Sequence, residues 1–167
     1  GRYKIVEKKS PFGMTLNPDP QIVELTYAGQ EVEITTVSAA FYNERQKVQI
    51  DLTKVLEQDE RFGIGMNGEI LSVQFGLYAA EPLEAADGSV ILKDGLLEIV
   101  SCDENGKAVF STDIPAGAKL YVKEYSTDGH YQISGQIYPV EYEYAGQDVA
   151  VVHISINDGE PICNEII

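Results

Sequence analysis

The sequence at residues 48–54 is Val48-Gln49-Ile50-Asp51-Leu52-Thr53-Lys54, in which apolar and polar side chains alternate. Successive side chains of a β-strand point to opposite faces of the sheet, so this alternation predicts a strand with one apolar face. That face holds a valine, an isoleucine and a leucine, and the next position on it is a lysine. The stretch therefore predicts a half-buried strand that ends on an inward-facing cation.

The same alternation recurs along the chain and is interrupted by turn dipeptides. Strand-like runs rich in Val, Ile, Tyr and Phe occupy residues 3–6, 22–27, 73–78, 119–122 and 149–156. Asn-Gly or Asp-Gly pairs, which accept the positive φ angles of tight turns, stand at residues 87–88, 94–95, 105–106, 128–129 and 158–159. Many short strands with regular turns predict an all-β sandwich or barrel. Only residues 56–61 and 79–85 favour a short helix.

Charge and composition exclude several classes of function. The 167 residues include 27 Asp and Glu against 12 Lys and Arg, a net charge of -15, which opposes binding to nucleic acid or to an anionic membrane. No apolar stretch approaches the length of a membrane span. We expect no cofactor and no metal, because no phosphate-binding or nucleophile motif is present and the two histidines lie far apart. We favour free thiols at Cys102 and Cys163, although the two could pair if their strands are adjacent.

An internal repeat divides the chain. Tyr27-Ala28-Gly29-Gln30-Glu31-Val32 recurs as Tyr144-Ala145-Gly146-Gln147-Asp148-Val149, an offset of 117 residues from Tyr27 to Tyr144. Glu7 and Glu124 have the same offset of 117, and Asn43 precedes Asn164 by 121. Three landmarks in one order predict a tandem array of β modules, of which this chain is a segment. We expect residues 1–43 to be the C-terminal part of one module and residues 44–167 to be a complete module.

Three polar residues of the expected complete module fall on apolar strand faces. Lys54, Glu124 and Asn164 each follow aliphatic residues, or lie between them, at two-residue spacing. A lysine, a glutamate and an asparagine aimed at one core are costly to bury unless they pair with one another. Glu7 and Asn43 hold the matching positions of the partial module. The alternative interpretation is that each residue marks a strand end outside the core, but three together favour mutual pairing.

Beyond these patterns, the sequence resembles a known family. It is similar to the B-type (CnaB-type) repeats of Gram-positive collagen adhesins and to the SpaA-type pilin domains. The resemblance lies in LTKV at residues 52–55, VQFGLYA at 73–79, IPAGAKLYVKE at 114–124 and ICNE at 162–165. Residues 1–13 resemble the penultimate strand and loop of a preceding domain. The resemblance implies an all-β, prealbumin-like (Ig-like, CnaB-type) β-sandwich.

In that family a lysine on the first strand and an asparagine on the last join into an isopeptide bond, assisted by a buried acid. The resemblance implies Lys54 as the nucleophile, Asn164 as the acceptor and Glu124 as the acid. Burial lowers the pKa of a lysine and raises that of a glutamate, so a neutral amine can attack an amide that a protonated acid polarises. Lys47 and Asn157 stay open as an alternative nucleophile and acceptor, although Lys47 lies on the opposite strand face and Asn157 precedes an Asp-Gly turn.

The resemblance implies a structural function. We expect a stalk or pilin-like repeat of an extracellular, cell-wall-anchored adhesin, with neighbouring repeats as partners, no insertion into a membrane and no enzymatic turnover. The alternative is a module that binds a host matrix protein or a glycan through residues 83–95 or 126–136. Tyr125, Tyr131 and Tyr138 are its candidate contacts, unless they pack on neighbouring strands instead. An enzyme of transthyretin-like shape is disfavoured, because no catalytic constellation is visible.

Overall fold

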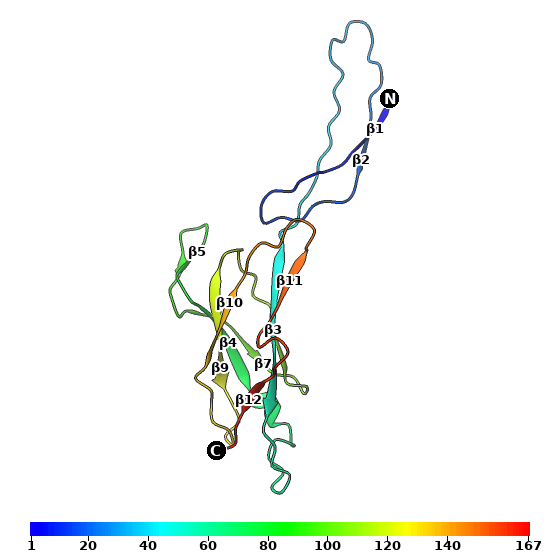
Figure 1. Cartoon of the computed structure of the whole chain (residues 1–167). Coiled ribbons are helices and arrows are strands. Elements are labelled where there is room, and N and C mark those ends of the chain that lie inside the picture. The colour runs from blue at the N-terminus through cyan, green and yellow to red at the C-terminus, as the bar shows by residue number, and fades with distance from the viewer. The chain divides into compact units, whose positions relative to one another are not determined.

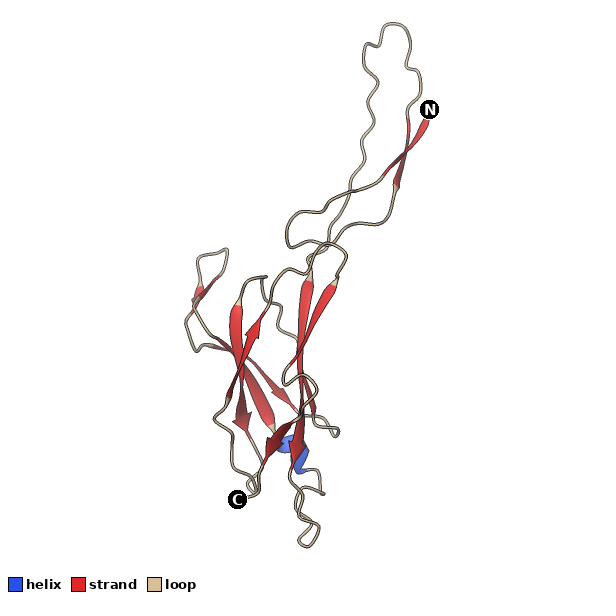
Figure 2. Cartoon of the chain, viewed as in Figure 1, coloured by secondary structure: helices blue, strands red, loops and turns tan.

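The structure, a computed structural model, describes all residues from Gly1 to Ile167 and divides into two compact units. Unit 1 consists of Gly1–Gln46 and Tyr144–Ala150, and unit 2 consists of Lys47–Glu143 and Val151–Ile167. A short segment of the later half of the chain therefore belongs to unit 1, although the sequence on both sides of it belongs to unit 2. The regular structure of both units is almost entirely β (Figure 2).

Unit 1 contains one small sheet and little apolar core. Its strands β1 (Arg2–Ile5) and β2 (Gln21–Glu24) pair antiparallel. Val23 is its only buried apolar side chain, whereas Tyr27 and Ile34 are 80% and 75% exposed. A two-stranded sheet is marginal by itself. Unit 1 therefore depends on hydrogen bonds outside its sheet.

Gln46 supplies several of these hydrogen bonds. The side chain is fully buried, and its Nε2 donates to the carbonyl groups of Gly146 at 3.0 Å and Val149 at 2.7 Å. Its Oε1 accepts from the Ala145 N–H at 3.0 Å. A buried amide satisfied in this way specifies one position for the segment that it holds. The segment Tyr144–Ala150 is thus fixed within unit 1.

Removal of the Tyr144 hydroxyl is expected to loosen unit 1. The hydroxyl donates to the Met14 carbonyl at 2.8 Å, and the ring packs edge-on against Phe12 with centroids 4.8 Å apart. Tyr144→Phe keeps the ring contact and loses one hydrogen bond, so the free energy of local opening falls by about 1 kcal/mol. Tyr27→Phe is the matched control, because Tyr27 holds the equivalent place in the sequence repeat but is 80% exposed. Amide hydrogen exchange in residues 8–16 measures both variants, and equal protection would contradict the prediction.

Unit 2 is a sandwich of two sheets (Figure 1). The first sheet has the antiparallel order β10 (Ile137–Glu141), β9 (Lys119–Ser126), β4 (Gln74–Ala79) and β7 (Leu96–Ser101). The second sheet is built on β3 (Lys47–Leu56), which pairs with β8 (Lys107–Phe110), β11 (Val151–Ser155) and β12 (Ile162–Asn164). A hairpin of β5 (Leu83–Glu84) and β6 (Val90–Ile91) and the 3-10 turn η1 (Glu69–Ser72) lie outside these sheets.

The long strand β3 is shared between the last two strands of the chain. β11 pairs parallel with the first half of β3, from Lys47 to Asp51. β12 pairs parallel with its last three residues, from Lys54 to Leu56. The first and last strands of unit 2 are therefore hydrogen-bonded neighbours, and the point where they meet includes Lys54.

Alternate residues of the strands form the core between the two sheets. The buried positions of β3 are Val48, Ile50, Leu52, Lys54 and Leu56, and those of β9 are Leu120, Val122 and Glu124. Phe75 and Leu77 of β4 are 0% exposed, and burial of one such side chain stabilises the fold by about 1.5–3 kcal/mol. The all-β sandwich predicted from the alternation is confirmed. Two of its apolar rows, on β3 and β9, include a charged residue.

Both predicted short helices are wrong. Residues 56–61 leave the end of β3, and residues 79–85 lead from β4 into β5. Pairing of the adjoining strands outweighs the helix propensity of these residues, because helix propensity contributes little energy for each residue. The one helical segment, η1, follows Gly68 at φ 86° and is blue in Figure 2. A single turn of this length cannot cross a bilayer, and no other helix is present.

Candidate functional site

Lys54 lies inside the sandwich and is only 2% exposed. Its backbone N–H donates to the Gly106 carbonyl at 2.7 Å, which ties β3 to the turn before β8. Gly106 has φ 76°, and an added Cβ would lie 2.0 Å from the Lys54 carbonyl oxygen, so the position requires glycine. The Asn-Gly turn predicted from the sequence thus fixes the strand that directs the lysine into the core.

Asn164 reaches the same place from the last strand. β12 pairs Ile162 with Lys54 and Asn164 with Leu56, and alternation on this strand buries Asn164 while leaving Cys163 exposed. Asn164 is 2% exposed, like the lysine. The Lys54 Nζ donates a hydrogen bond to Asn164 Oδ1. The amine and the side-chain amide are therefore in direct contact.

Glu124 comes from β9 in the facing sheet and completes the cluster. The carboxylate is 2% exposed, and its Oε1 lies 3.1 Å from Lys54 Nζ. The same oxygen accepts from Asn164 Nδ2 at 2.9 Å. The second oxygen, Oε2, accepts from the Ser134 N–H at 2.6 Å. The structure thus brings together the three residues that the sequence singled out, each from a different strand.

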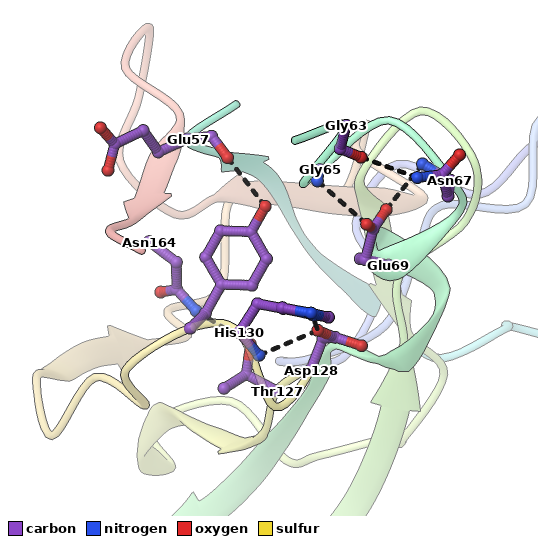
Figure 3. Close-up of polar contacts among 10 residues, drawn as sticks. Glu57, Gly63, Gly65, Asn67, Glu69, Thr127, Asp128, His130 and Asn164 are labelled. Carbon is purple, nitrogen blue, oxygen red and sulfur yellow. Dashed lines mark hydrogen bonds and ion pairs between the residues drawn. The ribbon is translucent and has the colours of Figure 1, made fainter. Parts of the chain in front are cut away.

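Thr127 and Ser134 complete the surroundings of the cluster, and neither is predicted from the sequence. Thr127 Oγ1 accepts from Asn164 Nδ2 at 3.1 Å, and the two residues lie side by side in Figure 3. Ser134 contributes only its backbone N–H, to Glu124. Both residues lie in the connection between β9 and β10, where no strand period marks them. Their hydrogen bonds hold the amide and the carboxylate in place around the lysine.

Electrostatics at Lys54 favour a reactive amine. Burial disfavours the ammonium and lowers the pKa of Lys54 below its usual value, while the nearby Glu124 carboxylate opposes part of this effect. The Phe75 ring lies 5.6 Å from Nζ and forms part of the apolar wall. Because only the neutral amine has a free electron pair, a lowered pKa makes the nucleophilic form easier to reach.

The alternative residues lie outside the cluster. Lys47 is exposed at the start of β3, on the face opposite to that of Lys54. Asn157 is exposed at φ 55°, in the turn that follows β11. Neither residue contacts Glu124. The geometry therefore favours Lys54 and Asn164 as the pair that could react.

Unit 1 contains a matching acid and amide. Asn43 Nδ2 donates to Glu7 Oε2 at 2.7 Å, and the same oxygen accepts from the Asn17 N–H at 2.7 Å. Asn17 precedes Ser134 by 117 residues, the offset of the sequence repeat. No lysine amine pairs with Glu7 in the structure. Unit 1 therefore has the acceptor and the acid of the cluster but no nucleophile.

Two of the three tyrosines expected to contact a ligand are buried. Tyr131 is 3% exposed and donates its hydroxyl to the Glu57 carbonyl at 2.8 Å. Tyr138 is 8% exposed, because alternation along β10 directs it inward. Only Tyr125 is available to solvent, at 47% exposure. Tyr131 and Tyr138 therefore follow the alternative prediction, packing inside the fold, and only Tyr125 stays a candidate contact.

The two cysteines are expected to react very differently with thiol reagents. Cys163 is exposed, whereas Cys102 is 3% exposed and burial raises its pKa to about 11. Since the thiolate is the reactive form, Cys102 stays unreactive in the native protein between about pH 7 and 9. Maleimide labelling followed by mass spectrometry should show one modified thiol in the native chain and two after denaturation. Rapid modification of both thiols in the native protein would contradict this prediction.

No family model and no curated protein sequence matches the chain, but solved structures do. The Bacillus anthracis TIE protein has a TM-score of 0.56 at 20% identity, over 100% of this chain and 25% of that chain. A C-terminal fragment of the pilus adhesin SpaC from Lactobacillus rhamnosus GG has a TM-score of 0.47 at 13% identity, over 100% and 77%. GBS52, the minor pilin of Streptococcus agalactiae, has a TM-score of 0.42 at 18% identity, over 100% and 60%. Gram-positive pilus proteins are thus among the solved structures similar to this chain. The chain, which spans a quarter of the length of the TIE protein structure, shares its β-sandwich fold.

Proposed function

We propose that the chain is a structural, pilin-like repeat of a Gram-positive surface protein, locked by a self-formed isopeptide bond between Lys54 and Asn164. The observation that carries the proposal is the buried contact of the lysine with the asparagine and Glu124. Burial of such a trio costs stability unless its members are closely paired. A covalent bond would remove the charge and the amine from the core.

The reaction needs one proton relay. Lys54 passes an ammonium proton to Glu124, 3.1 Å away, and becomes a neutral amine. The amine attacks the side-chain carbonyl carbon of Asn164, which forms the Nζ–Cγ bond and later breaks the Cγ–Nδ2 bond. Glu124 returns its proton to Nδ2, which it already contacts at 2.9 Å. Glu124 then takes the second proton from Nζ, Nδ2 leaves as neutral ammonia, and Glu124 ends as an uncharged acid beside the new amide.

Folding provides the rate acceleration. The paired strands β3 and β12 hold the amine against the amide, so a reaction between two distant residues becomes effectively unimolecular. The bond forms once for each chain and no product is released except ammonia. The chain is therefore not an enzyme that turns over a substrate.

The bond would give unit 2 mechanical strength. Lys54 and Asn164 are 110 residues apart in the sequence, yet they lie on neighbouring first and last strands. A pulling force that enters near one of them and leaves near the other passes through the covalent bond. The residues between them then bear no load, which suits a stalk that must not stretch.

Residues 1–43 and 44–167 are proposed to belong to successive modules of a tandem array on the cell surface, with neighbouring modules as partners. Repeated backbone hydrogen bonds support this division. The Gln46 N–H donates to the Gly13 carbonyl at 2.9 Å, and the Ile167 N–H donates to the His130 carbonyl at 3.1 Å. The two donors are 121 residues apart and the two acceptors are 117 residues apart. These are the same offsets that separate the repeated sequence landmarks. The net charge of -15 would keep such an array solvated and extended.

Single-molecule stretching of the full chain tests the proposed function. The wild-type chain should show no extension step from residues 54–164, because the crosslink bypasses them. Lys54→Met should release these 110 residues, a gain of about 400 Å at roughly 3.6 Å for each residue. A wild-type chain that extends as far as the variant would overturn the proposal.

A further inference from the structure

A segment of the later repeat binds a loop of the earlier repeat within unit 1. The segment is Tyr144–Val149, here called the docking segment, and the loop is Lys8–Leu16, here called the receiving loop. By the sequence repeat, the docking segment belongs to residues 44–167 and the receiving loop to residues 1–43. The contact between them is therefore a contact between successive repeats.

The tyrosine and the glutamine of the repeated motif make this contact. Gln147 Oε1 accepts from the Ser10 N–H at 3.0 Å. The Tyr144 hydroxyl donates to the Met14 carbonyl at 2.8 Å, and its ring packs on Phe12. Ser10 is only 6% exposed beneath the segment. The motif thus works as a binding element that uses one side-chain acceptor, one hydroxyl and one ring.

A second docking segment is present in the same conformation but is exposed. Tyr27–Val32 differs from the first only by a glutamate in place of an aspartate. Gly29 has φ 111° where Gly146 has φ 101°, and in both copies the last valine N–H donates to this glycine carbonyl, at 3.3 and 3.5 Å. Tyr27 is 80% exposed, and its hydroxyl makes no hydrogen bond. Tyr27–Val32, here called the exposed docking segment, thus has the backbone conformation of Tyr144–Val149 but is not bound to a receiving loop.

A second receiving loop is also present, at the C-terminal end of unit 2. Residues 125–133 lie at the repeat offset of 117 from the first loop. Met14 of the first loop forms an isolated antiparallel β-bridge with Arg45. Tyr131 of the second loop forms the equivalent bridge with Ile166. Thr127, which has a hydroxyl like Ser10, takes the equivalent position. The backbone that holds a docking segment in unit 1 is thus repeated in this open receiving loop, where no docking segment is bound.

We propose that the exposed docking segment of one copy of the chain binds the open receiving loop of a second copy, head to tail. In this complex the Tyr27 hydroxyl donates to the Tyr131 carbonyl, and the Gln30 side-chain oxygen accepts from the Thr127 N–H. Both bonds repeat those of Tyr144 and Gln147 in unit 1. The inference rests on the repeat organisation proposed above and is independent of the crosslink.

Two departures from the repeat limit the strength of this complex. Gly129 stands where the first receiving loop has Phe12, so the ring contact is lost. Ile167 stands where unit 1 has Gln46, so the three hydrogen bonds of that amide have no counterpart. Within one chain the two elements have a high effective concentration with respect to each other. Two separate copies of the chain lack this advantage. The complex is therefore expected to be weak and must be measured at high protein concentration.

Intermolecular paramagnetic broadening of NMR signals tests the proposal on the full chain. One copy carries a nitroxide on Gly129→Cys, where an added Cβ meets no atom within 4 Å, together with Cys163→Ser. Cys102 stays unlabelled because it is buried. The second copy is labelled with ¹⁵N, and the two are mixed at about 1 mM, where a millimolar complex is populated. The amides of Tyr27–Val32 should broaden strongly, and those of Tyr144–Val149 should not.

Two controls make the result specific. A nitroxide on Ser89→Cys, in the hairpin of β5 and β6 at the other end of unit 2 from the C-terminus (Figure 1), should leave the Tyr27–Val32 amides sharp. Tyr27→Ala in the ¹⁵N-labelled copy should abolish the broadening, and this exposed substitution leaves the fold intact. Absent broadening, uniform broadening, or broadening that survives Tyr27→Ala would overturn the proposal. The intact mass of the same samples reports the crosslink separately, so the two proposals can fail independently.

Discussion

Replacement of Lys54 with methionine is expected to lower the free energy of unfolding of unit 2 by about 5 kcal/mol. A crosslink between Lys54 and Asn164 closes a loop of 110 residues, and loss of a link of this length costs about 4–5 kcal/mol in chain entropy. Methionine keeps most of the lysine volume, so the core itself loses little. Guanidinium chloride unfolding of the wild type and the variant measures the difference.

Two further variants separate the contributions. Lys47→Met changes an exposed lysine on the same strand and should alter stability by less than about 0.5 kcal/mol. Asn164→Ala also removes the crosslink but leaves the Lys54 amine beside Glu124, so its cost reports loss of the covalent bond with an ion pair formed in its place. If Lys54→Met were as stable as Lys47→Met, the crosslink would not contribute to the fold.

Glu124→Gln is expected to leave the folded chain without its crosslink. The glutamine has the same shape and can still accept the Ser134 N–H, so the sandwich should form. It cannot carry the proton from Lys54 to Asn164, and such proton transfer typically contributes about 10²–10⁴ in rate. Mass spectrometry of freshly purified protein, followed over time, should show conversion slowed at least about 100-fold.

Glu98→Gln is the matched control for this slow conversion. Glu98 also accepts several hydrogen bonds, from Ser111 and Thr112, but it lies on β7 outside the cluster. Its substitution should leave the extent of crosslinking unchanged. Conversion of Glu124→Gln at the wild-type rate would remove Glu124 from the proposed mechanism.

The sequence predicts the strands that build the cluster and the side chains that face it. Burial on a strand has a strict period of two, so the alternation of residues 48–54 is enough to place Lys54 in the core. The same rule places Glu124 on β9. Asn164 is a harder prediction, because β12 has only three residues and its parallel pairing with β3 depends on the rest of the sandwich.

Residues that lie in loops cannot be placed by alternation. Thr127 and Ser134 hold the amide and the carboxylate, but their positions depend on how the connection after β9 folds back. The hairpin of β5 and β6 is too short to show a period. Tyr131 shows the same limit, because the sequence leaves open whether this loop residue is exposed or packed, and in the structure a hydrogen bond to Glu57 holds it.

The sequence repeat predicts two equivalent segments but not their different environments. Tyr144 is bonded within unit 1, whereas Tyr27 is exposed, although the surrounding residues are nearly identical. Tyr144 contacts Met14 and Phe12, which are more than 100 residues away in the sequence, and such contacts are visible only in the folded chain. The composition likewise shows that the chain is acidic. It does not show that Glu124 and Lys54 are buried together.

The intact mass of the denatured wild-type protein tests the central claim most directly. We expect a chain lighter than its sequence by one ammonia, with proteolysis yielding a branched peptide that joins the fragments containing Lys54 and Asn164. Neither the mass loss nor the branched peptide should occur in Lys54→Met. A folded wild-type chain at the full mass of its sequence, with no branched peptide, would contradict the account.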